Sequence, residues 1–159
     1  MATTDGTITV RPATMADVEA VTAITAAAYR KYIPRMGRQP RPMTDDYSQI
    51  FASQPVWVAD LGQRPIAVLV LMPEPAAMLI YSVAVHPDYQ KRGLGRRLLT
   101  LAEEQALAAG YQQIRLYTNE HMVENIALYL QLGYQETGRE PVSGTNIVHM
   151  VKALGGEAP

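Results

Sequence analysis

The sequence contains no cysteine among its 159 residues. This absence excludes disulfide bonds, thiolate metal sites and a cysteine nucleophile, and it agrees with a reducing compartment. An excess of one charge is also missing, because 14 Lys and Arg stand against 15 Asp and Glu, for a formal net charge of −1. That balance argues against a general nucleic-acid-binding protein. We therefore expect no metal and no nucleic-acid partner.

Long hydrophobic runs are absent as well. The longest strongly apolar run covers residues 66–72, which is too short to cross a bilayer. The first ten residues hold no basic cluster and no apolar stretch, so they do not resemble a signal peptide. The length fits one domain with a sound core. We expect a single domain over residues 1–159 that is cytoplasmic and has no membrane partner.

The pattern of apolar residues predicts an α/β fold of the α+β kind. Apolar runs bounded by turn residues indicate strands, and apolar residues at helical spacing indicate helices. Strands are expected at 8–10, 56–58, 66–71, 78–85, 113–117, 134–139 and 147–152, and helices from 14, 44, 94 and 125 onward. The segment 32–43, rich in Pro, Gly and Arg, is expected to be a loop. The order predicts a mixed, mostly antiparallel sheet of six to seven strands, with about four helices on both faces.

A glycine-containing turn opens the helix that is expected from residue 94. Residues 90–95 read QKRGLG, and the start of a helix presents unpaired N–H groups that attract an anion. Lys91, Arg92, Arg96 and Arg97 add positive charge in a stretch without acids. The turn therefore suits a phosphate, although it is neither a P-loop nor a complete dinucleotide fingerprint. By itself, a tight turn that only packs the helix on the sheet explains these residues equally well.

The residues around this turn resemble a known superfamily. VAVHPDYQKRGLG at 83–95, followed by a leucine-rich helix, closely resembles the coenzyme A signature of the GNAT superfamily of N-acetyltransferases. NIALY at 125–129 and LGY at 132–134 resemble the second conserved block of that superfamily, and ITVRPA at 8–13 resembles its opening strand. The resemblance covers nearly the whole chain. It implies a GNAT-like fold with a splayed central strand pair, and acetyl-coenzyme A as the cofactor.

The same resemblance implies roles for individual residues. The main chain at Val83 and Val85 would pair with the pantetheine arm as an added strand does, and the Val85 N–H would donate to the thioester carbonyl. The backbone from residue 91 to residue 96 would hold the pyrophosphate. The implied cofactor contacts are Val83, Ala84, Val85, Gln90, Lys91, Arg92, Gly93, Leu94, Gly95, Arg96, Asn125 and Tyr129.

Tyr129 matches the tyrosine that the superfamily places near the departing sulfur, where a phenol stabilises developing thiolate by a hydrogen bond. Its helical spacing alone would favour a core aromatic beside Leu128 and Leu132, and the motif favours the functional role. Many relatives carry Asn seven residues before this tyrosine, where this chain has Met122. Asn125 either substitutes for that contact or caps the helix.

The general base is not evident in the sequence. Relatives often keep a glutamate at the positions of Leu79 or Tyr117, and neither is acidic here. Glu120 and His121 are the candidate bases that remain, with an exposed loop residue as the alternative for each. The missing base favours an acceptor amine of low pKa. Neutralising a lysine-like amine at pH 7 costs about 4.6 kcal/mol, whereas an α-amine costs about 1 kcal/mol.

Five basic residues and no acid fall between positions 30 and 41. In the superfamily this segment walls the acceptor site. We expect Tyr29, Tyr32, Arg35 and Arg38 to bind the acceptor, with the arginines holding a carboxylate or phosphate. A solvated basic loop is the alternative.

The sequence therefore predicts an acyltransferase, specifically an acetyl-coenzyme A-dependent N-acetyltransferase. A primary amine of a small molecule or of a peptide or protein N-terminus would attack the thioester directly in a ternary complex. Relatives are often homodimers, so the resemblance allows a homodimer here. Two alternatives remain, namely a non-catalytic acyl-coenzyme A sensor and an O-acyl or longer-chain acyltransferase of the same fold. Tyr129 favours catalysis, and the absence of an assigned base keeps the sensor open.

Overall fold

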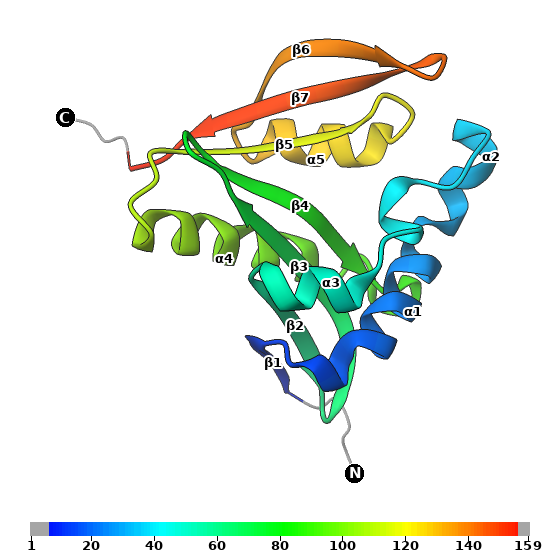
Figure 1. Cartoon of the computed structure of the whole chain (residues 1–159), viewed down its shortest axis with the longest axis vertical. Coiled ribbons are helices and arrows are strands. Elements are labelled where there is room, and N and C mark those ends of the chain that lie inside the picture. Colours follow the sequence, from blue (N-terminus) through cyan, green and yellow to red (C-terminus); the bar gives the residue numbers. More distant parts are fainter. Residues whose placement is uncertain (1–6, 156–159) are drawn as a thin grey trace.

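The computed structural model describes residues 7–155. Seven strands form one sheet in the order β1-β2-β3-β4-β5-β7-β6 (Figure 1). The strands are β1 Ile8–Pro12, β2 Val56–Leu61, β3 Arg64–Pro73, β4 Met78–Val85, β5 Gln113–Asn119, β6 Gln135–Val142 and β7 Thr145–Ala153. Neighbouring strands are antiparallel except β4 and β5, which are parallel. The mixed, mostly antiparallel sheet predicted from the sequence is confirmed.

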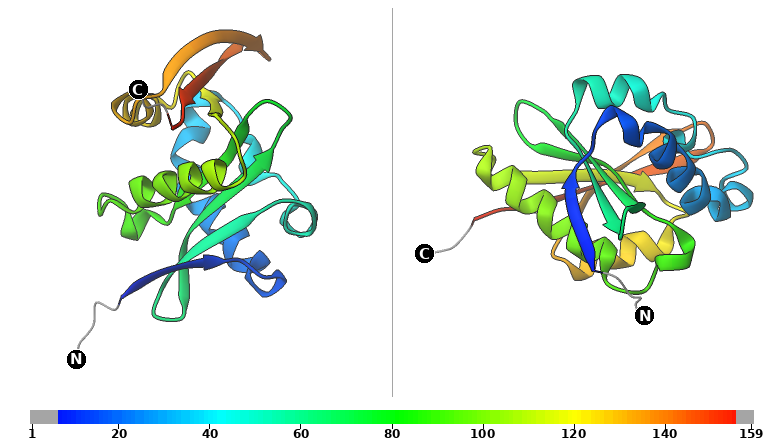
Figure 2. Two further views of the ribbon diagram at one scale, coloured as in Figure 1. Left: turned by 90° about the vertical axis from the view of Figure 1, so that its left-hand side faces the viewer. Right: turned by 90° about the horizontal axis from the view of Figure 1, so that it is seen from below.

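Helices cover both faces of this sheet. They are α1 Val18–Tyr29, α2 Ile33–Met36, α3 Tyr47–Ser53, α4 Leu94–Ala108 and α5 Val123–Gln131. One-turn 3-10 helices lie at Met15–Asp17, Arg30–Tyr32, Arg41–Met43 and Pro87–Tyr89. Helices α1 and α3 pack on one face, and α4 and α5 pack on the other (Figure 2, right).

Each face of the sheet has its own apolar core. Helix α1 buries Val21, Ile24 and Ala28 on one face, and α4 buries Leu98 and Ala102 on the other. These side chains recur every three or four residues, so each helix presents one apolar stripe to the sheet. Strand β3 lies between the two cores and is buried on both faces along most of its length. A strand of this kind reads as a continuous apolar run, which explains why the sequence showed no alternation there.

The segment 32–43 is not the loop that the sequence predicted. A 3-10 turn continues α1, α2 follows, and a further 3-10 turn begins at Arg41. Tyr32 anchors the segment because its side chain is only 3% exposed. Pro34 lies in the first turn of α2, where proline is tolerated, and Gly37 ends the helix with a φ of 74°. Proline and glycine here mark the ends of short helices rather than an irregular chain.

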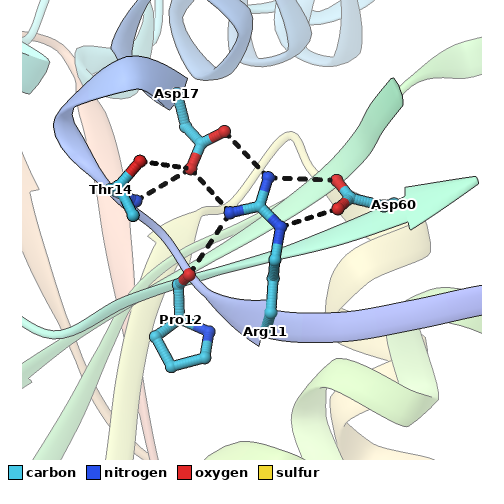
Figure 3. Close-up of polar contacts among 5 residues, drawn as sticks. All are labelled: Arg11, Pro12, Thr14, Asp17 and Asp60. Atoms are coloured by element: carbon cyan, nitrogen blue, oxygen red, sulfur yellow. Dashed lines mark hydrogen bonds and ion pairs between the residues drawn. The ribbon is translucent and has the colours of Figure 1, made fainter. Parts of the chain in front are cut away.

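A buried charge cluster joins β1, β2 and the start of α1 (Figure 3). Arg11 donates from Nε to Asp60 Oδ2 at 2.6 Å, and both of its terminal nitrogens donate to the Asp17 carboxylate at 2.9 Å. Asp17 also accepts from the Thr14 N–H at 2.8 Å, and the two residues form a capping box at the start of this helical segment. The hydrogen bonds from Arg11 hold the pKa of Asp17 below its usual value. This cluster fixes the first strand against the helix that follows it.

Candidate functional site

The two central strands separate partway along their length. Strands β4 and β5 are paired only at Met78–Ile114, Leu79–Arg115 and Ile80–Leu116. Beyond these pairs the strands diverge, and the gap between them opens toward α1 and α2 (Figure 1). The splayed strand pair implied by the resemblance is therefore confirmed.

Strand β4 presents main-chain groups to this gap. The N–H of His86 donates to the Ile66 carbonyl of β3 at 2.9 Å. Since successive residues of a strand direct their N–H and C=O groups to opposite edges, the main chain of Val83 and Val85 faces the gap. Ala84 faces β3, where it pairs with Val68, and its side chain is buried beside α1. Both residues predicted to pair with pantetheine, Val83 and Val85, therefore direct main-chain groups into the gap, whereas Ala84, also predicted to contact the cofactor, does not.

Side-chain donors already reach the two carbonyls of this edge. Gln90 Nε2 donates to the Val85 carbonyl oxygen at 3.0 Å. The Tyr29 hydroxyl donates to the Val83 carbonyl oxygen at 3.4 Å. Tyr29 belongs to α1, so this contact joins the helix on one face of the sheet to the exposed edge of β4.

The glycine-containing turn connects β4 to α4. Gly93 has a φ of 79° and Lys91 a φ of 67°, so both residues adopt the left-handed conformation. The first intrahelical bond runs from the Arg97 N–H to the Gly93 carbonyl at 3.0 Å. The N–H groups of the residues between them therefore precede the hydrogen-bond ladder of the helix. A helix start of this kind favours an anion, and the anion site at this turn stays a prediction.

The basic side chains of the turn have partners on the surface. The Arg92 guanidinium lies over the Tyr89 ring, 5.5 Å from its centre. Arg96 donates to Gln131 Oε1 in α5 at 2.8 Å, and Arg97 donates to the Ile8 carbonyl at 3.3 Å. Backbone N–H groups are therefore the principal donors for an anion at this turn, and the side chains supply the surrounding positive charge.

Tyr129 lies in α5, on the same face of the sheet as α4. Its ring packs edge-on against Tyr134, with 5.9 Å between the ring centres. Burial raises the pKa of Tyr129, and the neighbouring phenols of Tyr29 and Tyr32 raise it further. Those two tyrosines come from the α1 side, so the gap in the sheet brings phenols from both faces close together. Tyr129 is therefore a neutral hydrogen-bond donor at physiological pH.

Asn125 does not cap α5. The helix begins at Val123, two residues earlier than the sequence predicted, so Asn125 lies inside its first turn. Met122 is buried, accepts from Thr118 Oγ1 at 3.2 Å and lies 3.9 Å from Asn125 Nδ2. Tyr32 is close to Asn125, and burial raises the pKa of Tyr32 to about 12.

A cavity of about 320 Å³ adjoins the gap. Strands β4, β5, β6 and β7 contribute to its wall together with the segment from α2 to the 3-10 turn at residue 41. Its lining residues are Tyr29, Met36, Arg38, Pro40, Arg41, Pro42, Tyr81, Arg115, Tyr117, Thr118, Asn119, Met122, Glu140, Val142, Ile147 and His149. Because Tyr29 also contacts the Val83 carbonyl, this cavity and the gap share a wall. Its volume falls within the range of small-molecule sites.

Two of the four residues predicted to bind the acceptor line this cavity. Tyr29 and Arg38 do, whereas Tyr32 and Arg35 do not. Arg35 instead pairs with Glu124 of α5 through two hydrogen bonds of 2.7 and 3.0 Å, and its guanidinium lies 5.2 Å from the centre of the Tyr32 ring. The hydrogen bonds from Arg35 lower the pKa of Glu124 to about 2. Arg41, one of the other basic residues of the segment, lines the cavity with Arg38.

Neither candidate base from the sequence lines the cavity. The Glu120 carboxylate accepts from the Asn146 side chain at 3.2 Å, from the Asn146 N–H at 2.9 Å and from Thr145 Oγ1 at 3.1 Å. These hydrogen bonds lower the pKa of Glu120. Glu120 thus holds the turn between β6 and β7, and His121 is exposed on the loop after β5. A carboxylate held in this way is poorly suited to accept a proton.

The cavity wall does contain an imidazole paired with a carboxylate. His149 Nε2 lies 2.9 Å from Glu140 Oε1, and the His149 ring is 5.9 Å from the ring of Tyr117. Sequence patterns predicted only that His149 lies in a strand at 147–152, and they indicated no part for it in the site. The pair depends on the register between β6 and β7, which shifts at a bulge between Glu136 and Gly138. No local signal in the sequence indicates that shift.

Comparison with known proteins defines the class. Residues 20–134 match the acetyltransferase (GNAT) family, and the chain belongs to that family. Among curated proteins it is similar to N-acetyltransferase family 8 member 2 of Rattus norvegicus, with 26% identity over 110 residues, or 62% of this chain and 49% of the relative. N-acetyltransferase 8B of the same organism is 26% identical over 89 residues, which cover 52% of this chain and 40% of the relative. The chain thus spans about half the length of these relatives or less.

Solved structures share the fold. The PaiA N-acetyltransferase of Thermoplasma acidophilum, solved in complex with coenzyme A, has a TM-score of 0.79 at 14% identity, over 92% of this chain and 99% of that one. The ribosomal-protein-S18-alanine N-acetyltransferase of Escherichia coli has a TM-score of 0.77 at 20% identity, over 96% and 97%. At these identities the likeness shows the GNAT fold alone.

Two further properties concern residues 7–155 as a whole. Within this range, none of the helices combines the length and apolar character needed to span a membrane. The same residues contain no group of three or more His, Cys, Asp or Glu side chains placed to hold a metal ion.

Proposed function

We propose that this protein transfers an acetyl group from acetyl-coenzyme A to a primary amine of a small molecule or a peptide N-terminus. The gap between β4 and β5 is the observation that carries the proposal. The proposal is supported by the β4 edge that is not paired with β5 along the gap, by the helix start of α4 and by the partly buried Tyr129, which lies on the same face of the sheet as α4. Coenzyme A has matching parts, because it carries pantetheine amides, a pyrophosphate and a thiol.

The residues of this chain fit that cofactor at each part. The main chain of Val83 and Val85 would pair with the pantetheine amides, and the N–H groups at the start of α4 would hold the pyrophosphate. Bound acetyl-coenzyme A supplies an activated acetyl thioester. The Val85 N–H donates to the carbonyl oxygen on which negative charge develops. Tyr129 donates its hydroxyl proton toward the departing sulfur.

The acceptor would enter through the cavity on the α1 side. A protonated amine must lose a proton before or during its attack on the thioester, so the wall needs a proton acceptor. Imidazole is the side chain that serves most often as a general base, and Glu140 orients the imidazole of His149. We propose that His149, directly or through water, takes this proton. An imidazole in the wall does not change the free energy needed to neutralise the amine at a given pH, so an acceptor amine of low pKa is still favoured.

Substitution of the imidazole provides a direct check. His149→Gln should lower kcat/KM about tenfold at pH 7, below the usual effect of a general base because water can replace it in part. His121→Gln is the comparator, since His121 lies outside the cavity wall. A loss in His121→Gln with full activity in His149→Gln would assign the base to the loop after β5.

Release of free thiol from acetyl-coenzyme A tests the proposed function itself. The rate should rise several-fold over hydrolysis when suitable amines are added, and mass spectrometry should find the acetylated amine. Binding of coenzyme A without turnover on any amine would favour the acyl-coenzyme A sensor. Turnover only with hydroxyl acceptors, or only with longer acyl chains, would favour the related acyltransferases. Absence of coenzyme A binding would overturn all of these readings.

A further inference from the structure

The charges in the wall of the cavity do not balance. Three arginines line it, and one of them, Arg115, is neutralised by two hydrogen bonds of 2.7 and 3.1 Å to Glu74. Neither Arg38 nor Arg41 forms an ion pair or a side-chain hydrogen bond with another residue in the range 7–155. Two guanidinium groups in one wall therefore have no anion of their own.

The carboxylates near the cavity are engaged elsewhere. Glu140 is the only acid in the wall within the described residues, and it faces His149 at 2.9 Å. Asp45 lies beside the cavity, where its Oδ2 accepts from the Tyr81 hydroxyl. Asn119 also lines the cavity and is only 4% exposed, yet its Nδ2 has no hydrogen-bond partner among the described residues. Among the residues that the structure describes, the wall thus holds two exposed guanidinium groups without an anion and, in Asn119, one buried amide N–H without an acceptor. Buried donors normally have a partner.

We infer that the acceptor carries an oxyanion, a carboxylate or a phosphoryl group, close to the amine that is acetylated, and that Arg38 and Arg41 bind it. Arginine suits both groups because its planar fork makes two parallel hydrogen bonds. The cavity volume suits an acceptor of small-molecule size, and Tyr81 and Tyr117 offer aromatic surface to its body. This inference rests on the proposed function, since it names the substrate class of the same site.

The inference replaces part of the expectation from the sequence. The sequence predicted Arg35 and Arg38 as the anion-binding pair. Arg35 already has a carboxylate partner in Glu124, so it has little capacity for a substrate anion. Arg41 takes its place because the 3-10 turn at residues 41–43 holds this side chain at the cavity.

Matched amines provide the test. Initial rates of thiol release are measured with L-phenylalanine, its amide and 2-phenylethylamine, and with β-alanine, 2-aminoethylphosphonate and propylamine. The acids should exceed the matched neutral or cationic amines in kcat/KM by about tenfold or more, as expected for charge-assisted hydrogen bonds. Comparison of β-alanine with 2-aminoethylphosphonate distinguishes a carboxylate from a phosphoryl group.

Variants connect that preference to the two arginines. Arg38→Gln combined with Arg41→Gln should raise KM for the preferred acid about tenfold or more and change KM for the matched uncharged amine by less than about twofold. Arg64→Gln is the control, because Arg64 is exposed at the start of β3 and outside the cavity. Thermal unfolding of the unsubstituted protein, the double variant and Arg64→Gln checks that each protein is folded.

The other outcomes distinguish a failure of the anion site from a failure of the proposed transfer reaction. Equal use of acids and amides, or equal KM changes for both in the double variant, overturns the inference while the acetyltransferase activity stands. If no amine is acetylated, binding of the same acids is measured by calorimetry in the presence of coenzyme A. Binding that requires Arg38 and Arg41 would then support the anion site and reject the transfer reaction, and an absence of binding would reject both.

Discussion

Tyr129→Phe should lower kcat about 100-fold and change the Kd for coenzyme A by less than about twofold. The substitution keeps the ring that packs on Tyr134 and removes only the hydroxyl, which we propose donates to the developing thiolate. Proton donation in a transition state contributes about 10²-fold or more, and its loss appears in kcat rather than in ground-state binding. Steady-state rates and calorimetric titration with coenzyme A measure the two quantities.

Tyr134→Phe is a closely matched control for this experiment. Tyr134 contacts Tyr129 ring to ring, and its own hydroxyl is buried without a hydrogen-bond partner among the described residues. We expect kcat to stay within about twofold of the unmodified protein. Equal kcat in Tyr129→Phe would remove this hydroxyl from the mechanism, and an equal loss in Tyr134→Phe would attribute the effect to packing.

The raised pKa of Tyr129 predicts how the rate should depend on pH. A group that acts as an acid works only while it is protonated, and burial raises the pKa of Tyr129 above its ordinary value near 10. Deprotonation of Tyr129 should therefore not limit the rate at any pH below about 10. If kcat falls as the pH rises toward 10 and still does so in Tyr129→Phe, deprotonation of a group other than Tyr129 causes the fall.

Arg11→Met should lower the free energy of unfolding by about 3 kcal/mol, or the Tm by about 10 °C. The variant leaves Asp17 and Asp60, which are 6% and 7% exposed, as buried carboxylates without a cation. Removing one partner of a buried ion pair is costly because the remaining charge stays desolvated. We place the loss at the low end for such pairs because the Arg11 side chain is itself 34% exposed. Arg64→Met, at an exposed arginine, should leave the Tm unchanged.

The loss in Arg11→Met should depend on pH. The folded-state pKa of Asp17 is lowered, so its contribution to stability is fully present above its unfolded pKa of about 3.9 and is lost as the pH falls below that value. Without Arg11, burial favours the protonated form of Asp17, and protonation relieves its unpaired charge. The two stability curves, measured by urea unfolding, should therefore converge below about pH 4. A constant difference down to pH 3 would mean that packing of the Arg11 stem, rather than charge, is responsible.

Local patterns in the sequence were sufficient for most of the fold. Strand β4 occupies the predicted residues 78–85, and α4 begins at the predicted glycine turn. Both depend on signals within a few residues, namely an apolar run and a helix start. The loop predicted at 32–43 was wrong because proline and glycine are common both in loops and at the ends of short helices. Burial of Tyr32, a tertiary effect, decided between the two.

The side-chain partners in the candidate site were harder to predict. The pairs Arg35–Glu124 and Arg115–Glu74 join residues far apart in the sequence, and only the folded sheet brings each pair together. The pair of His149 with Glu140 requires the correct register across a bulged hairpin. The sequence could indicate which segments would border the cavity, but it could not show which of their charges would already be neutralised. The assigned roles of Tyr129, Val85 and the glycine turn stay predictions.

The Tyr29 side chain connects the exposed edge of β4 with the cavity. Its hydroxyl donates to the Val83 carbonyl oxygen, and the same side chain forms part of the wall of the cavity. A ligand that pairs with the Val83 main chain would meet this hydroxyl at the same oxygen, and if it displaces the phenol, the Tyr29 hydroxyl would be free to contact a ligand in the cavity. The edge of β4 and the cavity would then be thermodynamically linked, and each ligand would change the affinity of the protein for the other by the same factor.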